Sequence, residues 1–453
     1  MQLASRLKVG PFMDYPAHKV RKHLSADALL RLVRLTFAQI PEHRPPGSTL
    51  SLTNVLMAAF ALFVLKDPSL LAFDQRRHDR NLKNIFGISQ VPCDTQLRTI
   101  LDGVDPSTLR PAFRAVFRQL QRGKALEPLV FYQGCYLLAL DGTEYFCSDK
   151  IHCASCLHKT HRQTGQVTYY HQMLGAVLLH PDCQVVIPLA PEPIIQQDGA
   201  TKNDCERNAA RRFLGRFRRE HPHLPVILVE DALSSNAPHI EDCHRCGVHY
   251  LLGVKEGDHA FLFEQVYAAS DAGRAPIFYR PGPVAGVEYN FRYVNGVPLN
   301  ASHPELRVNF FECWLEEDGR LTHDSWVTDL FVRPTNIVTL MRGGRARWKI
   351  ENETFNTLKN QGYHFEHNYG HGEQNLSVVL ALLMMLAFLV DQTQQLCSDL
   401  FRQVWDKLGS KRLLWERLRS FFHVFLFTTM QGLYEALLYG CAKLPPVLIN
   451  DSS

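Results

Sequence analysis

The sequence lacks a long hydrophobic run, which argues against a membrane-spanning protein. Its two most apolar stretches, residues 55–65 and 376–390, are shorter than the roughly 18 uncharged apolar residues that a spanning helix needs. The N-terminus also lacks the apolar core of a signal peptide. We therefore expect two buried helices and a cytoplasmic chain.

The sequence also has little net charge, no internal repeat and no low-complexity segment. A formal charge of +4 and a pI of about 8.4 are too mild to indicate a nucleic-acid partner by themselves. The distribution is more informative, because Arg and Lys cluster at 207–219 and 342–359. Without an export signal, the twelve cysteines are expected to be free thiols or metal ligands in a reducing compartment.

The first 130 residues follow a helical pattern. Ser25 is placed to cap a first helix, and a second is expected over 54–65. Residues 81–86, a turn at Gly87 and a helix capped by Asp94 have the arrangement of a helix–turn–helix unit. Plain helix packing explains the same pattern, so both DNA reading and packing remain open.

From Cys135 the apolar period changes to that of an α/β fold with a mixed sheet. Asn203 and Glu206 are spaced as a capping box at the start of a long helix. Two hairpin turns, at 294–297 and 317–320, indicate a β-rich insertion, and the chain becomes helical after Pro334. Strands are expected at 136–140, 167–180, 183–190, 226–230 and 249–255.

Asp141 and Asp231 each directly follow an expected apolar strand. Carboxylates at the ends of buried strands are rigidly held and open to a crevice, where they bind hard cations well. Glu351 is the candidate for a third carboxylate. The alternatives are ordinary: an Asp after a strand is often a turn or cap residue, and a helical Glu is usually solvated.

Three segments carry a resemblance to a known family. LDGTEYF around Asp141, VEDALSSN around Asp231 and RARWKIENETFNTLKNQGYHFEHNYGHG around Glu351 resemble the DDE transposases of bacterial insertion sequences. The last segment is similar to the branch with a Tyr–Arg–Glu–Lys signature. Arg347 precedes Glu351 by four residues, Lys359 follows it one residue later than usual, and Gly344 stands where the signature has Tyr.

The resemblance covers about residues 80–392 and implies an RNase H-like catalytic core. It implies that Asp141, Asp231 and Glu351 bind Mg²⁺ or Mn²⁺ and that the protein cuts and joins double-stranded DNA at terminal inverted repeats. It also implies a homodimer on DNA and a nucleoid-associated enzyme. The expected regions are a helical N-terminal domain (1–130) that binds DNA ends, a core (131–257 and 336–395), a β-rich insertion (258–335) and C-terminal helices (396–453).

Several cations are expected to contact DNA phosphates, although each has a structural alternative. Arg347 and Glu351 share a helix face, so an intrahelical ion pair is the alternative for Arg347. His367 and His371 either contact DNA or structure their loop. Glu230 is expected to face away from its neighbour Asp231. The expected DNA contacts are Arg347, Lys359, Arg345, Arg342, Arg207 and Arg211.

Two C-x-x-C pairs raise the possibility of structural zinc. Cys153 and Cys156 supply two ligands from one turn, and Cys243 and Cys246 are candidates for the other two. The second pair falls in an expected helix, where cysteines are usually core residues. A zinc-binding DNA-binding protein without catalysis is therefore one alternative function. A host nuclease or an inactive relative of the same fold is the other.

Overall fold

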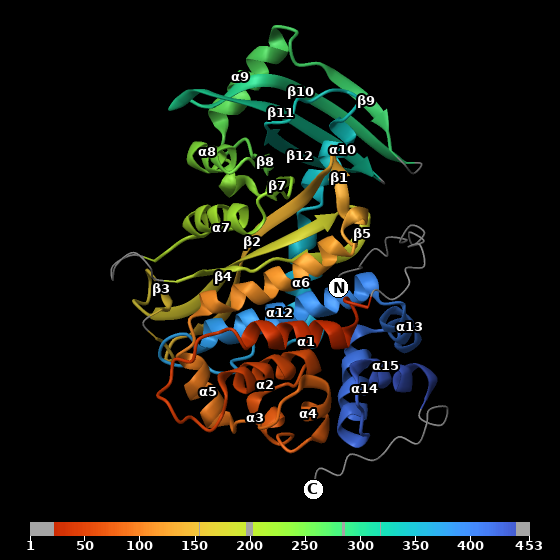
Figure 1. Ribbon diagram of the computed structural model, residues 1–453. Helices are drawn as coiled ribbons and strands as arrows, with labels where there is room; N and C mark the ends of the chain where they lie inside the picture. The colour runs from red at the N-terminus through yellow and green to blue at the C-terminus, as the bar shows by residue number, and fades with distance from the viewer. Residues whose placement is uncertain (1–21, 154, 196–202, 283–285, 318, 441–453) are drawn as a thin grey trace.

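The protein consists of a helical half and a large β-sheet that rises from it (Figure 1). The computed structural model describes residues 22–153, 155–195, 203–282, 286–317 and 319–440. Helices from both ends of the chain form the lower half of the view, and the sheet twists upward from them. The expectation of an α/β fold with a mixed sheet is confirmed at this level.

From residue 22 onward the N-terminal region is helical, as predicted; residues 1–21 lie outside the described residues. The hydroxyl oxygen of Ser25 accepts a hydrogen bond from the Ala28 N–H and caps the first helix. Gly87 ends α4 with a positive φ of 70°. The prediction that Asp94 caps α5 is wrong. Cys93 occupies the cap position, and Asp94 forms an ion pair with Arg98. The helices are α1 (Ala26–Phe37), α2 (Leu52–Leu65), α3 (Leu70–Asp74), α4 (Arg80–Phe86), α5 (Asp94–Asp102) and α6 (Arg110–Arg122).

The described strands belong to one sheet of twelve, with the central order β3-β4-β2-β7-β8-β12-β11-β10-β9. β7 and β8 run parallel to β2, whereas β4 and β12 pair antiparallel with their neighbours. Helix α7 packs on β2, β4 and β6, and α8 packs on β8. The bounds in this part are β1 (Val130–Tyr132), β2 (Cys135–Ser148), β3 (Leu157–Thr160), β4 (Val167–His180), β5 (Cys183–Pro188), β6 (Glu192–Ile194), α7 (Glu206–Glu220), β7 (Val226–Glu230), α8 (Ala237–Arg245) and β8 (His249–Gly253).

Two local predictions in this part are wrong. Strand β2 does not end at Asp141 but continues to Ser148, because its second half pairs with β4. Asn203 does not cap α7, since Cys205 holds that position and the Asn203 amide bonds the backbone of His158. Asp141 is therefore held within a continuous ladder rather than at a strand end.

The β-rich segment continues the central sheet, because β12 pairs with β8. The predicted hairpin at 294–297 is wrong: Gly296, with φ 73°, lies in a bulge within β10, and the chain reverses after Asn300. The hairpin at 317–320 is confirmed by the pairing of Glu317 with Arg320; Asp318 lies outside the described residues. The elements are α9 (Ala260–Asp271), β9 (Ile277–Pro281), β10 (Val287–Asn300), β11 (His303–Glu317) and β12 (Arg320–Thr328).

Helix α12 (Leu376–Cys397) is the central helix of the lower half. It is long and apolar enough to cross a membrane, but 94% of its most hydrophobic window is buried inside the molecule. It packs between α2 and β5, so it joins the helical half to the sheet. Both apolar runs thus form buried helices, as predicted.

The C-terminal helices pack on the N-terminal ones. The Asn81 side chain of α4 donates hydrogen bonds to the carbonyls of Phe422 and Phe425 at the end of α14. The described N-terminal and C-terminal helices therefore share one helical body. The remaining elements are α10 (Ile337–Arg345), the π-helical segment η4 (Ile350–Phe355), α11 (Asn356–Asn360), α13 (Asp399–Leu408), α14 (Lys411–Val424) and α15 (Met430–Tyr439).

Candidate active site

Asp141 and Asp231 lie on neighbouring parallel strands. Ala139 of β2 is paired with Val229 of β7, and each aspartate follows two residues later. Asp231 comes directly after the buried strand β7, and its carboxylate accepts a hydrogen bond from the Leu233 N–H. The sheet therefore brings the first two predicted carboxylates to adjacent positions.

Glu351 reaches the same place from a distant part of the chain. It lies in η4, which packs on β2, β4 and β5. The Arg347 guanidinium donates from one nitrogen to Asp141 Oδ2 at 3.3 Å and to Glu351 Oε1 at 2.9 Å. Asp141 and Glu351 are thus joined through Arg347. Wide turns of this π-helical kind occur often at functional sites.

The electrostatics of Asp141 reflect this convergence. Burial raises its pKa to about 7, and the charges of Glu351, Glu206 and Asp231 act in the same direction. Arg347 offsets part of the shift by stabilising the charged form. A carboxyl group that is largely buried beside acidic groups, with only Arg347 to offset them, is in an environment that a bound cation would relieve.

Glu206 is a fourth carboxylate near the site, and the sequence pattern suggested only a helix cap for it. It stands at the first turn of α7 and accepts a 2.6 Å hydrogen bond from Gln172. A Cβ on Gly142 would come within 2.1 Å of its Oε1, so a glycine in β2 makes room for it. Burial raises its pKa, and the charge of Asp231 adds to the shift.

Glu230 bonds to other partners. Its carboxylate contacts His239 of α8 at 2.5 Å and the Ser234 hydroxyl at 3.2 Å. This pairing agrees with the expectation that Glu230 is turned away from its neighbour Asp231.

A cleft of about 430 Å³ opens beside Asp231 and Arg347. Gly344, where the signature would have Tyr, lies against Trp326 of β12: a Cβ there would come within 2.4 Å of the indole nitrogen. The indole thus fills the space that a larger side chain at 344 would need. Trp348 lines the same cleft and is 58% exposed, which is unusual for so large a ring.

The other predicted DNA-contacting cations are spread more widely. Lys359 pairs with Glu366 rather than with the carboxylates. Arg342 pairs with Asp182 and Arg345 with Asp324, although Arg345 also lines the cleft. On α7, Arg207 is exposed and Arg211 pairs with Asp242. Within the described residues, Arg347 is the one of the six predicted DNA-contacting cations that contacts Asp141 and Glu351.

Among the described residues the two cysteine pairs do not form one group, so the hypothesis of a shared four-cysteine zinc site is wrong. Cys153 and Cys156 lie beside His171 and His371, two histidines that were not among the expected ligands. Cys243 is buried within α8 and is not part of this group. The His371 imidazole is buried here, so the structural reading of this residue is the one that fits. His367 remains exposed and packs edge-on against Tyr369.

Comparison with known proteins gives a distant likeness in fold and no match to a protein family or a curated sequence. Neither a protein-family model nor a curated protein matches the sequence. Among solved structures, the fold is similar to the piggyBac transposase in a cryo-EM structure of its synaptic complex with hairpin DNA, with a TM-score of 0.39 and 10% sequence identity. The alignment covers 94% of this chain and 83% of that chain. A likeness this distant identifies no residue of the site.

Proposed function

We propose that the chain is a DNA transposase of the DDE class, with Asp141, Asp231 and Glu351 as its metal-binding carboxylates. The observations that support this most are that Asp141 and Asp231 lie on or directly after neighbouring parallel strands, and that Arg347 joins Asp141 to Glu351. Two of them share Arg347, and acidic neighbours help to raise the pKa of Asp141 to about 7. Carboxylate oxygens are the ligands that Mg²⁺ and Mn²⁺ prefer, so the residues fit these ions.

The chemistry divides between the metal ions and the protein. Bound ions of this kind activate the attacking oxygen and stabilise the leaving oxygen of a phosphodiester. Asp141, Asp231 and Glu351 would hold them in place, because their strands and helix are rigidly packed. Bound metal ions would neutralise Asp141 and Glu351 in place of Arg347. The Arg347 guanidinium would then be free to bind a DNA phosphate.

The core of this enzyme is proposed to be RNase H-like. The arrangement that supports it is the antiparallel pair β4 and β2 followed by the parallel strands β7 and β8, with α7 and α8 packed on them. The proposed regions remain the helical N-terminal part (1–130), the core (131–257 and 336–395) and the C-terminal helices (396–453). The β-rich region 258–335 is then an extension of the core sheet.

The cleft supports a DNA path beside the carboxylates. Arg345 and Lys255 line it together with Arg347, and the exposed ring of Trp348 offers a surface on which a base can stack. Arg207, Arg211, Arg342 and Lys359 are proposed as outlying phosphate contacts; the last three would exchange their present acidic partners for DNA.

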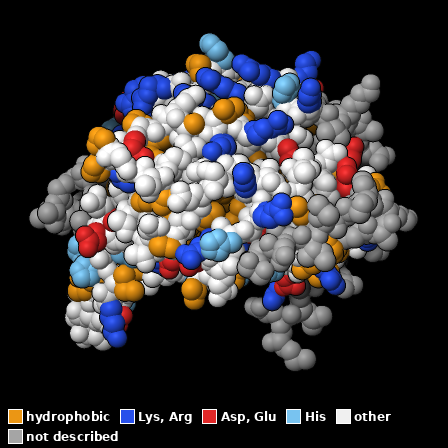
Figure 2. Space-filling view, turned by 60° about the horizontal axis from the view of Figure 1, so that its bottom comes forward, with side chains coloured by type: hydrophobic (Ala, Val, Ile, Leu, Met, Phe, Trp, Pro, Cys, Tyr) orange, Lys and Arg blue, Asp and Glu red, His pale blue; other side chains and the backbone are white. Residues whose placement is uncertain are grey.

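The helical half supports a second contact with the duplex. Figure 2 shows the lower side of the molecule in Figure 1, and Lys and Arg side chains form a band along one edge of this face. Separately from that band, α4, α14 and the segment before α4 carry the exposed cations Arg77, Arg80, Lys83, Arg412 and Arg417. We propose that this half binds the terminal inverted repeats and that two copies pair the two ends.

The test is cleavage and strand transfer by the purified full chain, using DNA ends taken from inverted repeats that flank its gene. We expect Mg²⁺- or Mn²⁺-dependent release of a 3′-OH and its joining to target DNA. Asp231→Asn should lower both rates by at least about a thousandfold, because metal ions stabilise the transition state by several kcal/mol. Asp271→Asn, which changes an exposed acid at the end of α9, should leave them unchanged. An Asp231→Asn variant that retains cleavage would overturn the proposal.

The same assay separates the alternatives that share this fold. A host nuclease would cut DNA without joining the 3′-OH to a target, and an inactive relative would do neither. A zinc-binding protein without catalysis would bind DNA and show no dependence on Asp141, Asp231 or Glu351.

A further inference from the structure

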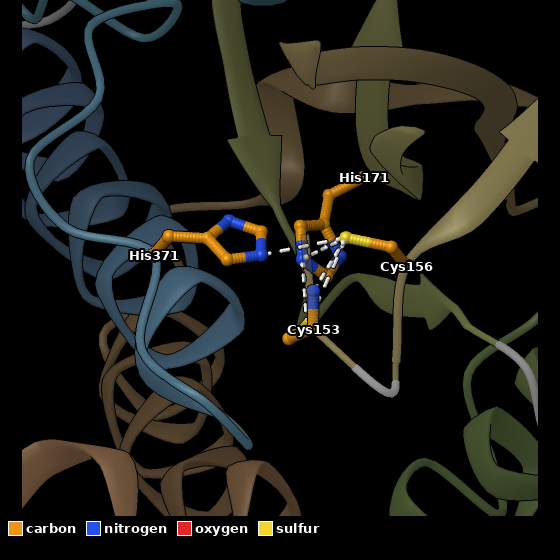
Figure 3. A group of neighbouring side chains, drawn as sticks. All are labelled: Cys153, Cys156, His171 and His371. Carbon is orange, nitrogen blue, oxygen red and sulfur yellow. Dashed lines mark hydrogen bonds between the residues drawn. The ribbon is translucent and has the colours of Figure 1, made fainter. Parts of the chain in front are cut away.

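Four metal-ligating side chains meet away from the carboxylates (Figure 3). Cys153 and Cys156 flank a turn between β2 and β3, His171 is in β4, and His371 lies in the segment that leads into α12. In Figure 3 the two imidazoles and the Cys156 sulfur point toward one another from these separate segments. All four ligand atoms lie within 4.8 Å of one another.

Four of the six distances between the ligand atoms agree with the edges of a zinc tetrahedron. Zn–S bonds of about 2.3 Å and Zn–N bonds of about 2.05 Å give S···S edges of about 3.8 Å and S···N edges of about 3.6 Å. The two sulfurs are 3.8 Å apart. The Nε2 of His171 lies 3.6 Å from the Cys153 sulfur and 3.5 Å from the Cys156 sulfur, and His371 Nε2 lies 3.4 Å from the latter.

The turn that carries the thiols is shaped as a two-ligand unit. The Cys156 N–H donates to the Cys153 carbonyl oxygen at 3.2 Å, which closes the turn. The Cys153 N–H in turn points at the Cys156 sulfur, at 3.4 Å. A C-x-x-C turn that presents both sulfurs to one side is the usual way in which one segment supplies two zinc ligands.

The burial of the group also calls for a ligand. His171 is 0%, Cys156 3% and His371 7% exposed. Buried imidazoles need good partners, and thiols are weak ones. The Tyr145 ring stacks on the His171 ring with 5.9 Å between ring centroids, and the centroids of Phe146 and His371 are 4.4 Å apart. Aromatic rings therefore cover the group.

We propose that Cys153, Cys156, His171 and His371 together bind one structural Zn²⁺ ion. Each thiol loses its proton to solvent as its sulfur bonds the metal, and each imidazole binds through Nε2 in its neutral form. Four protein ligands complete the tetrahedron, so the ion has no open position for water and takes no part in catalysis. The sulfur and nitrogen ligands distinguish this ion from the oxygen-bound ions of the carboxylates.

The zinc would join two halves of the proposed catalytic core. Cys153 and Cys156 follow the strand that carries Asp141, whereas His371 follows the helical segments that carry Glu351. One ion therefore fixes the Glu351 segment against the Asp141 strand. This consequence rests on the proposed function, whereas metal binding itself does not.

The first experiment measures zinc in the full chain, purified with and without added zinc but without chelators. We expect about one equivalent. Exchange for Co²⁺ should give thiolate-to-cobalt charge transfer and the intense visible bands of tetrahedral cobalt. Less than roughly a tenth of an equivalent after growth with zinc, together with no cobalt spectrum, would overturn the proposal.

Variants then test the ligand set. His371→Ala and Cys156→Ser should each lower the zinc content and alter or abolish the cobalt spectrum. Cys246→Ser and His367→Ala are matched controls, because they change a cysteine of the other C-x-x-C pair and an exposed histidine near His371. Full zinc content with an unchanged cobalt spectrum in His371→Ala would exclude His371 as a ligand.

If the variants do not fold, thiol protection in the wild-type chain provides the readout. Two thiols should become reactive only after a chelator removes the metal; no change on chelation would contradict the proposal. The outcomes also separate the two proposals. Zinc without DNA cleavage would refute only the transposase, and cleavage with neither zinc nor a cobalt spectrum would refute only the zinc site.

Discussion

Arg347 is the residue at which a structural and a DNA-binding role meet. Its guanidinium contacts Asp141 and Glu351, and its side chain is only 15% exposed. Arg347→Ala should therefore lower the melting temperature of the protein without Mg²⁺ or Mn²⁺, because the half-buried Asp141 and Glu351 lose the cation that they share. With Mn²⁺ present we expect near wild-type stability, about tenfold weaker binding to element ends and a salt dependence reduced by about one phosphate contact.

The control for this prediction is Arg274→Ala, which removes an exposed cation that follows α9 and is not among the proposed DNA contacts. It should change neither DNA binding nor the response to Mn²⁺. Normal DNA binding by Arg347→Ala, with a loss of stability that Mn²⁺ does not repair, would assign Arg347 to the fold alone.

Asp141 predicts an unusual dependence of stability on pH. Its pKa is raised to about 7 in the folded protein, chiefly by burial, whereas an unfolded Asp titrates near 4. Between these values the folded state binds more protons than the unfolded state, so the contribution of this group to stability falls as the pH rises from about 4 to about 7. Asp141→Asn should remove this contribution and, without added Mg²⁺ or Mn²⁺, raise the melting temperature at pH 8 by roughly 3 °C.

Thermal melts without added Mg²⁺ or Mn²⁺ and without a chelator, so that the proposed zinc ion stays bound, isolate this contribution from those of other acids when wild type and Asp141→Asn are compared across this pH range. Adding Mn²⁺ should reverse the order of the two proteins at pH 8, because only the wild type keeps the full carboxylate set. A difference between them that is independent of pH would show that Asp141 titrates normally.

At the scale of elements, the close contact between β4 and η4 positions Glu351. Gly175 is paired with Asp141, and a Cβ there would come within 2.8 Å of the Phe355 ring. Gly175→Ala should therefore push η4 away from the sheet and cost about 1–3 kcal/mol, as overpacking does. We expect a lower melting temperature and a cleavage rate reduced by about tenfold or more.

Gly257→Ala is the matched control, because a Cβ at that position meets nothing within 4 Å. The double variant Gly175→Ala/Phe355→Leu replaces the opposing ring with a smaller side chain. It should restore part of the lost stability and cleavage rate. Equal effects of the two alanine substitutions would contradict a role for this contact.

At the scale of the whole molecule, a buried ion pair connects the N-terminal helices to α12. Lys66, at the end of α2, is fully buried and pairs with Asp391, which also accepts a hydrogen bond from Tyr363. Burial lowers the pKa of Lys66 and raises that of Asp391. Lys66→Met should cost about 3–5 kcal/mol, because it leaves Asp391 without its cation.

The double variant Lys66→Met/Asp391→Leu should recover most of this loss, since replacing a whole buried pair with apolar groups is often neutral. Urea unfolding of the single and double variants measures both effects. A double variant as unstable as Lys66→Met would mean that the pair contributes through packing rather than charge.

The sequence by itself determined the local elements and the candidate carboxylates. Helical spacing and caps such as Ser25 depend on neighbours along the chain, so α1, α2 and the strand before Asp231 were predictable. The wrong predictions concern segments whose residues are compatible with two different local conformations. A Gly after an Asn serves a hairpin turn or a bulge equally well, and only the pairing of β10 with β11 selects the bulge at Gly296.

Only the tertiary structure decided which distant residues share a site. Glu206 has the spacing of a helix cap, yet its position beneath Gly142 depends on how α7 packs on the sheet. Likewise, nothing in the spacing of Cys153 and Cys156 identifies His171 and His371 as their partners. One belongs to a strand pattern and the other to a distant loop, and they meet because β4 and the start of α12 pack against the same turn. Contacts between segments far apart in the chain follow from packing and leave no periodic signal in the sequence.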